Sequence, residues 1–411
     1  MNSKNKVILV VFDDLFSGGA FTLTHSIFSG IKPKLPEDIY VLTGISANQV
    51  LRKELFPYAK KIITYSIPDV GHPLRFLHIL IRTIASIHAI QRQYFISAVV
   101  TNIVYSAVAA KFYCVVRKIP YIYLYHGALY LEKKSYLQGK ISSVRKLKHD
   151  AVHLLHWLMQ YYIVRFSVVG CFSIFSKSQI RQLFHQNKSR IIRVPFTLHE
   201  TTLEEKIAAR KLLGIDPNTS LIVAPSRIEP RKGQDALLKA LSSMPKDIRV
   251  TCLLCGPIHP NAVYYFSDLF RTLLPSTVNV FFTAEKTPED IWVLYKAADA
   301  TIMPSVGLET LGMVTLESLS VGTPVIAFSV GGSEEILRPF PELLAKHTTP
   351  LDLARAIVRF IRLPEPQKQT LKTQIKNYML RKYDPSHTLS DFHVLMSDAC
   401  VYGLSHHGST L

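Results

Sequence analysis

Short apolar runs recur along the chain, and each is followed by a turn containing glycine or proline and then by a longer stretch with helical spacing. The runs are continuous rather than alternating, which is typical of parallel strands covered by helices on both faces. The first half therefore predicts one α/β domain with a parallel sheet. Its strand candidates are Val7–Phe12, Ile39–Thr43, Lys61–Tyr65, Ala98–Thr101 and Tyr121–Tyr125.

The same alternation starts again in the second half, after a segment near Pro195–Asp216 that is rich in Thr and Glu. This repetition predicts a second doubly wound α/β unit, and a length of 411 residues suits two domains. We predict domains over residues 1–195 and 196–375, followed by a C-terminal helix and tail over residues 376–411. The predicted elements of the second domain include the strands Ser220–Ala224, Arg249–Cys255, Asn279–Phe282, Ala300–Met303 and Val325–Phe328 and the helix Gln234–Ser242.

Composition narrows the class of protein. Apolar residues make up 48% of the chain and charged residues 19%, which is a globular composition. The formal net charge of +18 indicates an acidic partner, for which nucleic acid, anionic lipid and a phosphorylated substrate are the candidates. The positive charges are dispersed, mostly over the first half, and form no basic motif interleaved with aromatic residues. Binding to nucleic acid is therefore the weaker prediction.

The N-terminal sequence predicts no secretory signal, because Met1–Lys6 leads directly into an apolar run of six residues without a cleavage site. Five cysteines without regular spacing favour a reducing, cytoplasmic compartment. The stretch that most resembles a membrane span is Ala151–Phe175, but histidine, glutamine and arginine residues interrupt it. We predict a buried helix there, followed by a strand over Val168–Phe175.

The stretch from Ala300 to Leu337 carries the most informative chemistry. A strand leads into a loop with Glu309, and Gly312 then opens a helix that carries Glu317, with seven residues between the two glutamates. The backbone N–H groups of Leu311, Gly312 and Met313 fall at this helix N-terminus, which is a favourable place for phosphate or sugar oxygens. Glu317 can reach a vicinal diol such as a ribose.

This stretch resembles the E-x7-E region of glycosyltransferase family 4, whose members are retaining enzymes of the GT-B fold. The resemblance implies that Glu309 contacts the donor sugar and that Glu317 binds the nucleotide ribose. Where the family most often has a Gly-aromatic pair, this chain has Thr310-Leu311, which leaves the identity of the sugar open. The implied fold is two facing Rossmann-like domains with doubly wound parallel sheets, and a C-terminal helix that returns to the first domain.

A second match is the segment Ala224–Gly233, with the sequence APSRIEPRKG. The resemblance implies that Arg227 and Lys232 grip the donor diphosphate. Retaining transfer builds negative charge on the leaving phosphate, and two fixed cations can stabilise that charge without a metal ion. We expect Arg231 to be solvated.

In the first domain, Gly18 and Gly19 follow the first strand and resemble the family's glycine-rich loop, where the backbone approaches phosphates and the acceptor. His126, after the strand Tyr121–Tyr125, stands where the family has a histidine that contacts the sugar. Ser176 stands where the family often has a serine near the cleft. An isolated histidine at a strand end is otherwise more often a structural hydrogen bonder.

The resemblance implies a retaining hexosyltransferase that moves a sugar from a nucleotide diphosphate sugar to a hydroxyl of a carbohydrate or lipid-linked acceptor. We expect the donor to be a substrate, with no permanently bound cofactor and no metal. The basic, apolar first half favours a role in envelope or extracellular polysaccharide, lipopolysaccharide or glycolipid synthesis. An inverting GT-B transferase, for which Asp13 or Asp14 is the nearby base candidate, and a nucleotide-sugar epimerase are the alternatives.

Two other patterns, a cysteine pair and a group of histidines, resemble metal or redox sites but have a simpler explanation. Cys252 and Cys255 have redox or zinc spacing but fall in a predicted buried strand, where core cysteines are expected. His149, His153 and His156 share a helical face without a nearby carboxylate, so a metal site is not predicted.

The segment Leu74–Ile90 is amphipathic and basic, with leucine and isoleucine at helical spacing. Most such helices only cover a sheet. Together with the excess charge of the first half, this helix also favours contact with an anionic membrane surface, peripheral on the inner face of the cell membrane.

Overall fold

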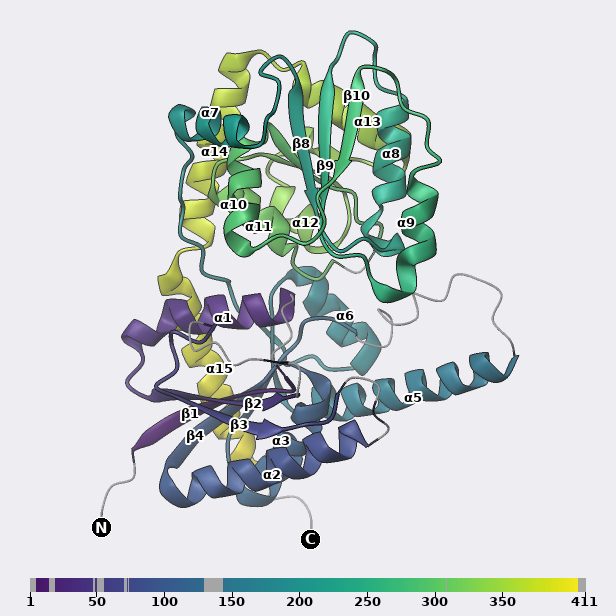
Figure 1. Ribbon diagram of the computed structural model, residues 1–411. Helices are drawn as coiled ribbons and strands as arrows, with labels where there is room; N and C mark the ends of the chain where they lie inside the picture. The colour runs from purple at the N-terminus through teal and green to yellow at the C-terminus, as the bar shows by residue number, and fades with distance from the viewer. Residues whose placement is uncertain are drawn as a thin grey trace. The chain divides into compact units, whose positions relative to one another are not determined.

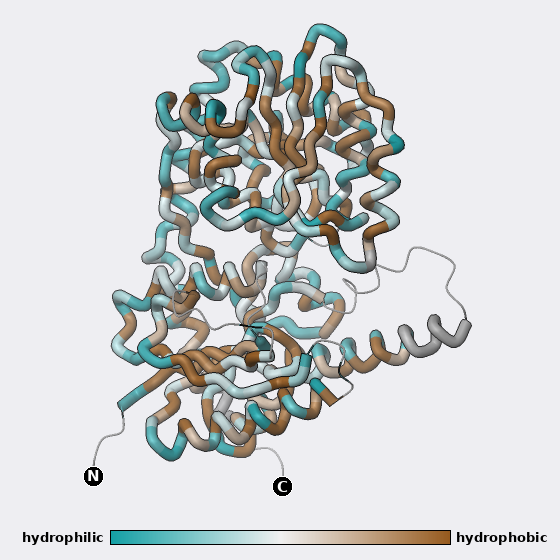
Figure 2. The backbone as a smooth tube through the Cα atoms, viewed as in Figure 1, coloured by the Kyte–Doolittle hydropathy of each residue, from teal (hydrophilic) through white to brown (hydrophobic). Residues whose placement is uncertain are grey.

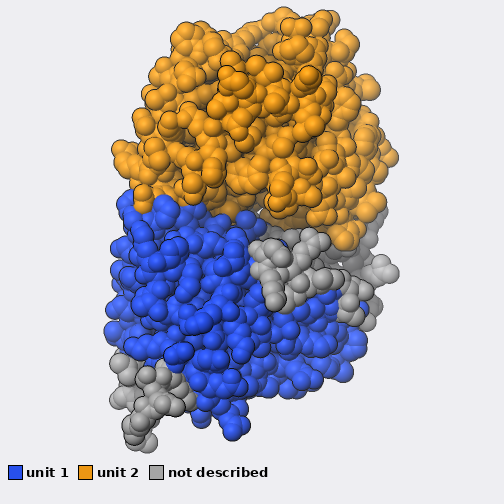
Figure 3. All heavy atoms as spheres, turned by 60° about the vertical axis from the view of Figure 1, so that its left-hand side comes forward, with its two compact units in different colours: residues 1–131, 141–195, 385–411 blue, residues 132–140, 196–384 orange. Residues whose placement is uncertain are grey.

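The computed structural model describes residues 5–14, 19–46, 49, 55–69, 72, 74–128, 143–307 and 309–405. The chain divides into two compact units, coloured separately in Figure 3. Unit 1 comprises residues 1–131, 141–195 and 385–411, and unit 2 comprises residues 132–140 and 196–384.

Unit 1 is built on a seven-stranded sheet with the order β3-β2-β1-β4-β5-β6-β7, and all of its neighbouring strands are parallel. The interior strand β1 is buried from Val7 to Phe12, as its continuous apolar sequence predicts. The strands are β1 (Lys6–Phe12), β2 (Asp38–Ile45), β3 (Lys61–Ser66), β4 (Phe95–Thr101), β5 (Tyr121–Leu124), β6 (Val168–Cys171) and β7 (Arg190–Ile191).

Helices cover both faces of this sheet, with α2 and α3 on the side away from α1 in Figure 1. On that side, α2 packs on α3 and α3 packs on α5. The helices of unit 1 are α1 (Gly19–Ile31), α2 (Arg75–Gln93), α3 (Val104–Arg117), α5 (Ser143–Arg165), α6 (Ile174–Phe184) and α15 (Pro385–Ser405).

The C-terminal helix α15 packs against α1, β5 and β6, so the predicted return of a C-terminal helix to the first domain is confirmed. The rings of Phe28 and Phe392 meet edge to face at 5.6 Å between centroids. The guanidinium of Arg193, beyond β7, pairs with the carboxylate of Asp391 at 2.7 Å. Apolar burial and this ion pair together fasten α15 to unit 1.

Unit 2 is built on a six-stranded parallel sheet with the order β10-β9-β8-β11-β12-β13. Its strands are β8 (Ser220–Pro225), β9 (Val250–Cys255), β10 (Val278–Phe282), β11 (Ala300–Met303), β12 (Val325–Phe328) and β13 (Leu344–Ala345). Figure 2 shows hydrophobic residues concentrated in these strands.

Figure 1 shows α8 and α9 on one side of strands β8 to β10 and α10 and α11 on the other. The helices of unit 2 are α7 (Leu203–Leu212), α8 (Gln234–Ser242), α9 (Val263–Leu269), α10 (Pro288–Ala297), α11 (Met313–Ser320), α12 (Gly331–Leu337), α13 (Pro350–Ile361) and α14 (Glu365–Lys382). Two parallel-sheet α/β domains are therefore present, as the sequence predicts.

One strand prediction is wrong in its extent. The predicted strand Val168–Phe175 ends at Cys171, because the hydroxyl of Ser173 accepts the N–H of Ser176 and opens α6. Ser176 is fully buried within this capping box, so its side chain serves the helix end rather than an open surface.

The helix predicted within Ala151–Phe175 is α5, and its outward side chains are exposed rather than buried, including Leu154, Leu155 and Leu158. Within the described parts of the chain, none of the helices is both long enough and apolar enough to cross a bilayer.

Candidate active site

The predicted donor residues of unit 2 lie on loops at the carboxyl edge of its sheet, where open parallel sheets bind ligands. These loops follow β8, β11 and β12, and backbone hydrogen bonds join them. The N–H of Val306 donates to the carbonyl of Arg231 at 3.0 Å, and the N–H of Gly332 donates to the carbonyl of Glu309 at 2.7 Å. The three loops therefore form one continuous surface.

Glycine is required where two of these loops meet. Gly233 has a φ of 70°, and a Cβ atom there would lie 1.9 Å from the carbonyl oxygen of Pro304. A side chain at this position would force the β8 and β11 loops apart. Gly233 thus holds the neighbouring Lys232 against the β11 loop.

Lys232 and Glu309 form an ion pair across this junction, with 2.8 Å between Nζ and Oε2. The hydroxyl of Ser305 donates to the same carboxylate oxygen at 3.3 Å. Burial is the largest single effect and would raise the pKa of Glu309, but the Lys232 ammonium, the Arg231 charge and the Ser305 hydrogen bond together outweigh it and leave that pKa below its ordinary value. Glu309 is therefore a carboxylate at neutral pH, and it shares its charge with Lys232.

Glu317 lies on α11 and meets Tyr295 of α10. The Tyr295 hydroxyl donates to Oε2 of Glu317 at 2.9 Å, and the Tyr295 side chain is almost fully buried. Burial raises the pKa of Glu317, and the hydrogen bond from Tyr295 opposes part of that rise. One carboxylate oxygen is thus fixed by the protein, which sets the direction of the other.

Arg227 follows β8 and keeps 44% of its side chain exposed, so its guanidinium is accessible to an anionic ligand. Its Nη2 atom lies 3.7 Å from Oε1 of Glu229. Arg231, which we expected to be solvated, is only 13% exposed and places Nε 2.7 Å from the same Glu229 oxygen. That prediction is wrong, because the buried carboxylate of Glu229 requires a cation beside it.

Gly312 caps α11 in a left-handed conformation, with a φ of 86°. A Cβ atom at Gly312 would lie 2.5 Å from the Ser333 hydroxyl oxygen, which in turn bonds Thr315 at 3.0 Å. The N–H groups of the first helical turn lack intrahelical partners by geometry. The predicted group of amides at Leu311, Gly312 and Met313 is therefore located where α11 begins.

Tyr295, Ser305 and Glu229 were not identified from the sequence. Each acts through a residue that was identified: Tyr295 contacts Glu317, Ser305 contacts Glu309, and Glu229 lies beside Arg227. The local sequence around Ser305, which follows a proline, and around Tyr295, which lies in an apolar run, does not indicate a role at the site. Only the folded arrangement brings these partners together.

The remaining predicted residues belong to unit 1. His126 follows β5, and its Nε2 atom lies 3.4 Å from the hydroxyl oxygen of Thr24. That hydroxyl donates to the carbonyl of Ala20 at 2.9 Å and accepts from the amide of Asn102 at 3.0 Å. Because the hydroxyl has a single proton, its contact with His126 requires Nε2 to be the protonated nitrogen. Burial lowers the pKa of His126 to about 3, so the ring is neutral.

Gly18 lies outside the described residues. Gly19 is the first residue of α1 rather than part of a loop, which corrects the sequence-based placement. A Cβ atom at Gly19 would meet none of the described residues within 4 Å, so these residues do not require glycine there.

Asp13 and Asp14, the base candidates for an inverting reaction, are both 4% exposed. Asp13 accepts the N–H groups of Ser106 at 2.5 Å and Tyr105 at 3.3 Å, at the start of α3. Burial raises the pKa of Asp13 to about 6, and Asp14 is paired with Arg75. Both carboxylates are thus engaged by the protein, which disfavours a base role.

The two cysteines with redox spacing are free and buried in β9, where burial raises the pKa of Cys252 and that of Cys255. His156 bonds the hydroxyl of Tyr105 at 2.7 Å. Across the residues with described positions, no three His, Cys, Asp or Glu side chains are grouped to hold a metal ion.

Comparison with known protein families finds a match in the second half of the chain. Residues 205–378 match the family "Glycosyl transferases group 1". The matched stretch contains Arg227, Lys232, Glu309 and Glu317, the residues gathered at the carboxyl edge of the unit 2 sheet.

Curated relatives agree with this match. Over 237 residues the chain is 31% identical to a GDP-mannose-dependent monoacylated alpha-(1-6)-phosphatidylinositol monomannoside mannosyltransferase of Corynebacterium glutamicum, covering 55% of this chain and 57% of the relative. Over 158 residues it is 33% identical to a D-inositol 3-phosphate glycosyltransferase of Mycobacterium sp., covering 38% of this chain and 35% of the relative. The chain thus spans between about a third and somewhat over half the length of these relatives.

Solved structures match almost the whole chain. Anabaena Alr3699/HepE in complex with UDP and glucose has a TM-score of 0.75 and 20% identity, covering 95% of this chain and 99% of that protein. WaaG, a glycosyltransferase involved in lipopolysaccharide biosynthesis, has a TM-score of 0.62 and 16% identity, covering 97% and 100%. The predicted GT-B fold is confirmed.

Proposed function

We propose that this protein is a glycosyltransferase that moves a hexosyl group from a nucleotide diphosphate sugar to a hydroxyl of an acceptor. The observation that carries the proposal is the grouping of Arg227, Lys232, Glu309 and Glu317 at the carboxyl edge of the unit 2 sheet, within the stretch that matches group 1 glycosyl transferases. Cations beside carboxylates at this edge suit a ligand that carries both a diphosphate and hydroxyl-rich rings.

Each residue has a distinct task in binding the donor. The exposed Arg227 and the neighbouring Lys232 hold the diphosphate, with the first amides of α11 as further donors. The oxygen of Glu317 that Tyr295 does not hold accepts the ribose hydroxyls. Glu309 orients the donor sugar, while His126 and Gly19 of unit 1 serve the sugar and the acceptor.

Transfer proceeds with retention of the anomeric configuration. The acceptor oxygen forms a bond to the anomeric carbon on the face from which the phosphate leaves, and the bond from that carbon to the phosphate oxygen breaks. The departing phosphate takes the proton of the acceptor hydroxyl, and Arg227 and Lys232 stabilise its remaining negative charge. No metal ion and no permanently bound cofactor takes part.

A thermal-shift screen over UDP-, GDP- and ADP-sugars tests the donor assignment. A structural neighbour is in complex with UDP, and a relative is named for GDP-mannose, so both bases belong in the screen. We expect one nucleotide sugar to raise the melting temperature of the wild-type chain and to have no effect on Glu317→Gln. NMR of the product then reads the anomeric configuration, and an inverted product would contradict retention.

The acceptor is a glycolipid or an envelope or extracellular polysaccharide precursor, reached at an anionic membrane surface by a protein that is otherwise cytoplasmic. Neighbouring helices of unit 1 support this proposal, because α2, α3 and α5 carry large apolar side chains that are about half exposed or more. Arg82 and Arg117 on the same helices are exposed cations. Apolar residues beside basic ones suit an anionic bilayer surface. The exposed apolar residues of these helices are Leu77, Ile81, Phe112, Val115, Val116, Leu154, Leu155 and Leu158, and Phe166 directly follows α5.

Sedimentation with phosphatidylglycerol liposomes tests the membrane proposal. We expect the wild-type chain to sediment at low salt and to be released as salt rises, because the charge contribution is screened. Leu154→Glu/Leu158→Glu should lower the bound fraction, whereas Leu273→Glu, at an 89% exposed leucine of unit 2, should not. Absence of binding at low salt would reject the membrane surface without touching the donor assignment.

A further inference from the structure

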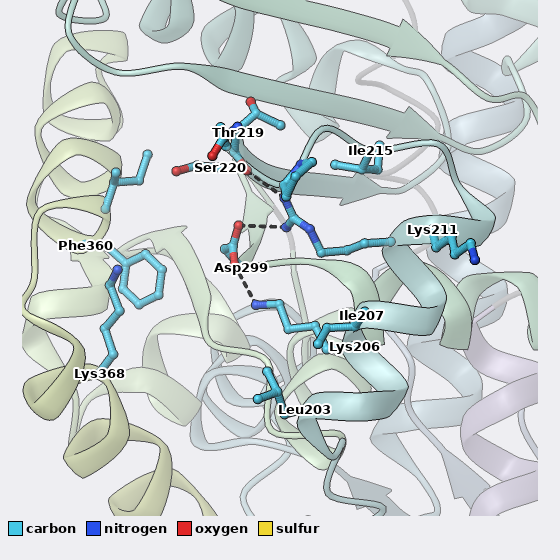
Figure 4. Close-up of a pocket in the computed structure, with 14 residues that line it drawn as sticks. Leu203, Lys206, Ile207, Lys211, Ile215, Thr219, Ser220, Asp299, Phe360 and Lys368 are labelled. Carbon is cyan, nitrogen blue, oxygen red and sulfur yellow. Dashed lines mark hydrogen bonds and ion pairs between the residues drawn. The ribbon is translucent and has the colours of Figure 1, made fainter.

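A cavity of about 660 Å³ lies at the amino edge of the unit 2 sheet. Thr219 and Ser220, where β8 begins, line it together with Asp299, which precedes β11 (Figure 4). The loop that carries Arg227 follows the other end of β8, which for a strand of this length lies roughly 20 Å away. The cavity is therefore separate from the candidate donor site.

The walls of the cavity combine apolar and cationic side chains. In Figure 4, Leu203, Lys206 and Ile207 extend from α7 on one side, and Phe360 and Lys368 face them from the other. Leu203 is 69% exposed and Ile207 is 58% exposed, although both are large apolar residues. An apolar ligand surface could cover these side chains and remove them from water.

Positive charge exceeds negative charge among the lining residues. Asp299 is the carboxylate of the lining, and it already accepts from Nζ of Lys206 at 2.5 Å, from Arg210 at 3.1 Å and from the N–H of Leu221 at 2.8 Å. Its bonding capacity is therefore largely used within the protein. The lining cations are Lys206, Arg210, Lys211 and Lys368.

Lys368 has only weak partners among the described residues. Its ammonium lies 3.9 Å from Glu365, whose side chain is 76% exposed, and 5.9 Å from the centroid of the Phe360 ring, and such a loose surface ion pair is weak. Lys372 lies close enough to feel the same charges. Burial lowers the pKa of Lys372, the charges of Lys206 and Lys368 lower it further, and those of Glu365 and Asp299 raise it. An anion in the cavity would relieve this repulsion.

We propose that the cavity binds a small phosphorylated molecule, with its phosphate against Lys206 and Lys368 and its apolar or ring-shaped body against Ile207 and Phe360. Lysine is a compact charge suited to phosphate, and the cavity volume is in the range of small-molecule sites. Inorganic phosphate alone would leave the apolar walls uncovered. This second site goes beyond glycosyl transfer and does not depend on it.

Calorimetric titration of the full-length chain with phenyl phosphate, and separately with inorganic phosphate, tests the proposal. We expect saturable binding of phenyl phosphate and at least about tenfold weaker binding of inorganic phosphate. Lys368→Gln and Ile207→Ser should each weaken phenyl phosphate about tenfold, because one removes the cation and the other the apolar contact. Lys239→Gln, at a 62% exposed lysine of α8, and Arg227→Gln in the donor site should leave binding unchanged.

Three results would overturn the second site. The first is no saturable binding of phenyl phosphate up to about 10 mM. The second is equal affinity for inorganic phosphate, which would mean that the apolar walls do not contribute. The third is binding that Arg227→Gln abolishes and Lys368→Gln leaves intact, which would place phenyl phosphate in the donor site. A melting temperature for each variant separates loss of binding from loss of folding.

Discussion

At the scale of single residues, Lys232 and Glu309 show how two separate sequence assignments become one interaction. The sequence predicts that Lys232 holds phosphate and that Glu309 holds the sugar. In the structure the two side chains form a pair at 2.8 Å, with 13% and 15% exposure. In the proposed donor complex, the diphosphate shares the Lys232 ammonium with Glu309, and this competition couples the binding of phosphate to the position of the Glu309 carboxylate.

A double-mutant cycle separates the stabilising and functional roles of this pair. Lys232→Gln should lower the free energy of unfolding by about 2 kcal/mol, because it leaves the mostly buried Glu309 carboxylate without its cation. Adding Glu309→Gln should restore most of that loss, since the uncompensated charge is gone. Transferase activity should stay absent in both variants. Chemical denaturation measures the first effect, and purely additive stabilities would contradict the pairing.

Tyr295 is the positioning residue that the structure adds to the candidate site. Tyr295→Phe keeps the ring but removes the hydrogen bond to Glu317, so we expect the KM for the nucleotide sugar to rise about tenfold with a smaller change in kcat. Tyr113→Phe is the matched control, because it removes a comparable tyrosine hydrogen bond, to Gln91 in unit 1. If both variants change KM equally, Tyr295 does not position Glu317 for the donor and its hydrogen bond serves only the structure.

Sequence reasoning at this scale predicted the charged candidate residues but not the side chains that contact them in the structure. Arg227, Lys232, Glu309 and Glu317 stand in recognisable local patterns. Tyr295 precedes Glu317 by 22 residues on another helix, and no spacing rule links them. Its role depends on how α10 and α11 pack, which is a tertiary property.

At the scale of elements, the two helix starts at Gly312 and Gly19 differ in whether the fold requires glycine. Gly312→Ala should lower the free energy of unfolding by about 1–2 kcal/mol, because its φ of 86° is left-handed and the new Cβ would strike Ser333. Gly19→Ala should change stability by less than about 0.5 kcal/mol, since no atom of the part of the chain that the structure describes lies within 4 Å of a Cβ there.

Activity assays then test whether a substrate comes close to either glycine. If the acceptor passes close to Gly19, Gly19→Ala should lose transfer while keeping the stability of the wild-type chain. Unchanged transfer by Gly19→Ala would remove Gly19 from the candidate site. For Gly312→Ala we expect donor binding and stability to fall together.

Element boundaries were predicted best where strands are buried and the turn chemistry is strong. The predicted strands Ala300–Met303 and Val325–Phe328 and the predicted helix Gln234–Ser242 coincide with β11, β12 and α8. Each is apolar or amphipathic along its full length and is bounded by proline or glycine within a few residues. The two-residue strands β7 and β13 gave no periodicity to detect.

At the scale of the whole molecule, α15 supports a unit from which it is remote in sequence. Phe392→Ala should destabilise unit 1 by about 3–5 kcal/mol, because Phe392 is fully buried against Phe28. Hydrogen–deuterium exchange should accelerate in β1 and β6 and stay unchanged in β8 and β11. Uniform acceleration in both units would mean that the chain unfolds as one cooperative body.

The repeated strand and helix pattern was sufficient to predict two parallel-sheet domains, because buried parallel strands have a continuous apolar signature. The resemblance to a family added the return of the last helix, which composition and periodicity could not supply. Side-chain pairing within unit 1 was not predictable in this way. The locking of Asp13 by the first N–H groups of α3 joins residues more than 90 positions apart.

The central claim is that the carboxyl-edge loops of unit 2 hold a nucleotide diphosphate sugar. Hydrogen–deuterium exchange of the full-length chain, with and without the donor found by screening, tests it most directly. The account predicts protection at residues 226–233, 304–317 and 329–335, and loss of that protection in Glu317→Gln. Binding of the donor with protection elsewhere, or with these three segments unchanged, would contradict it.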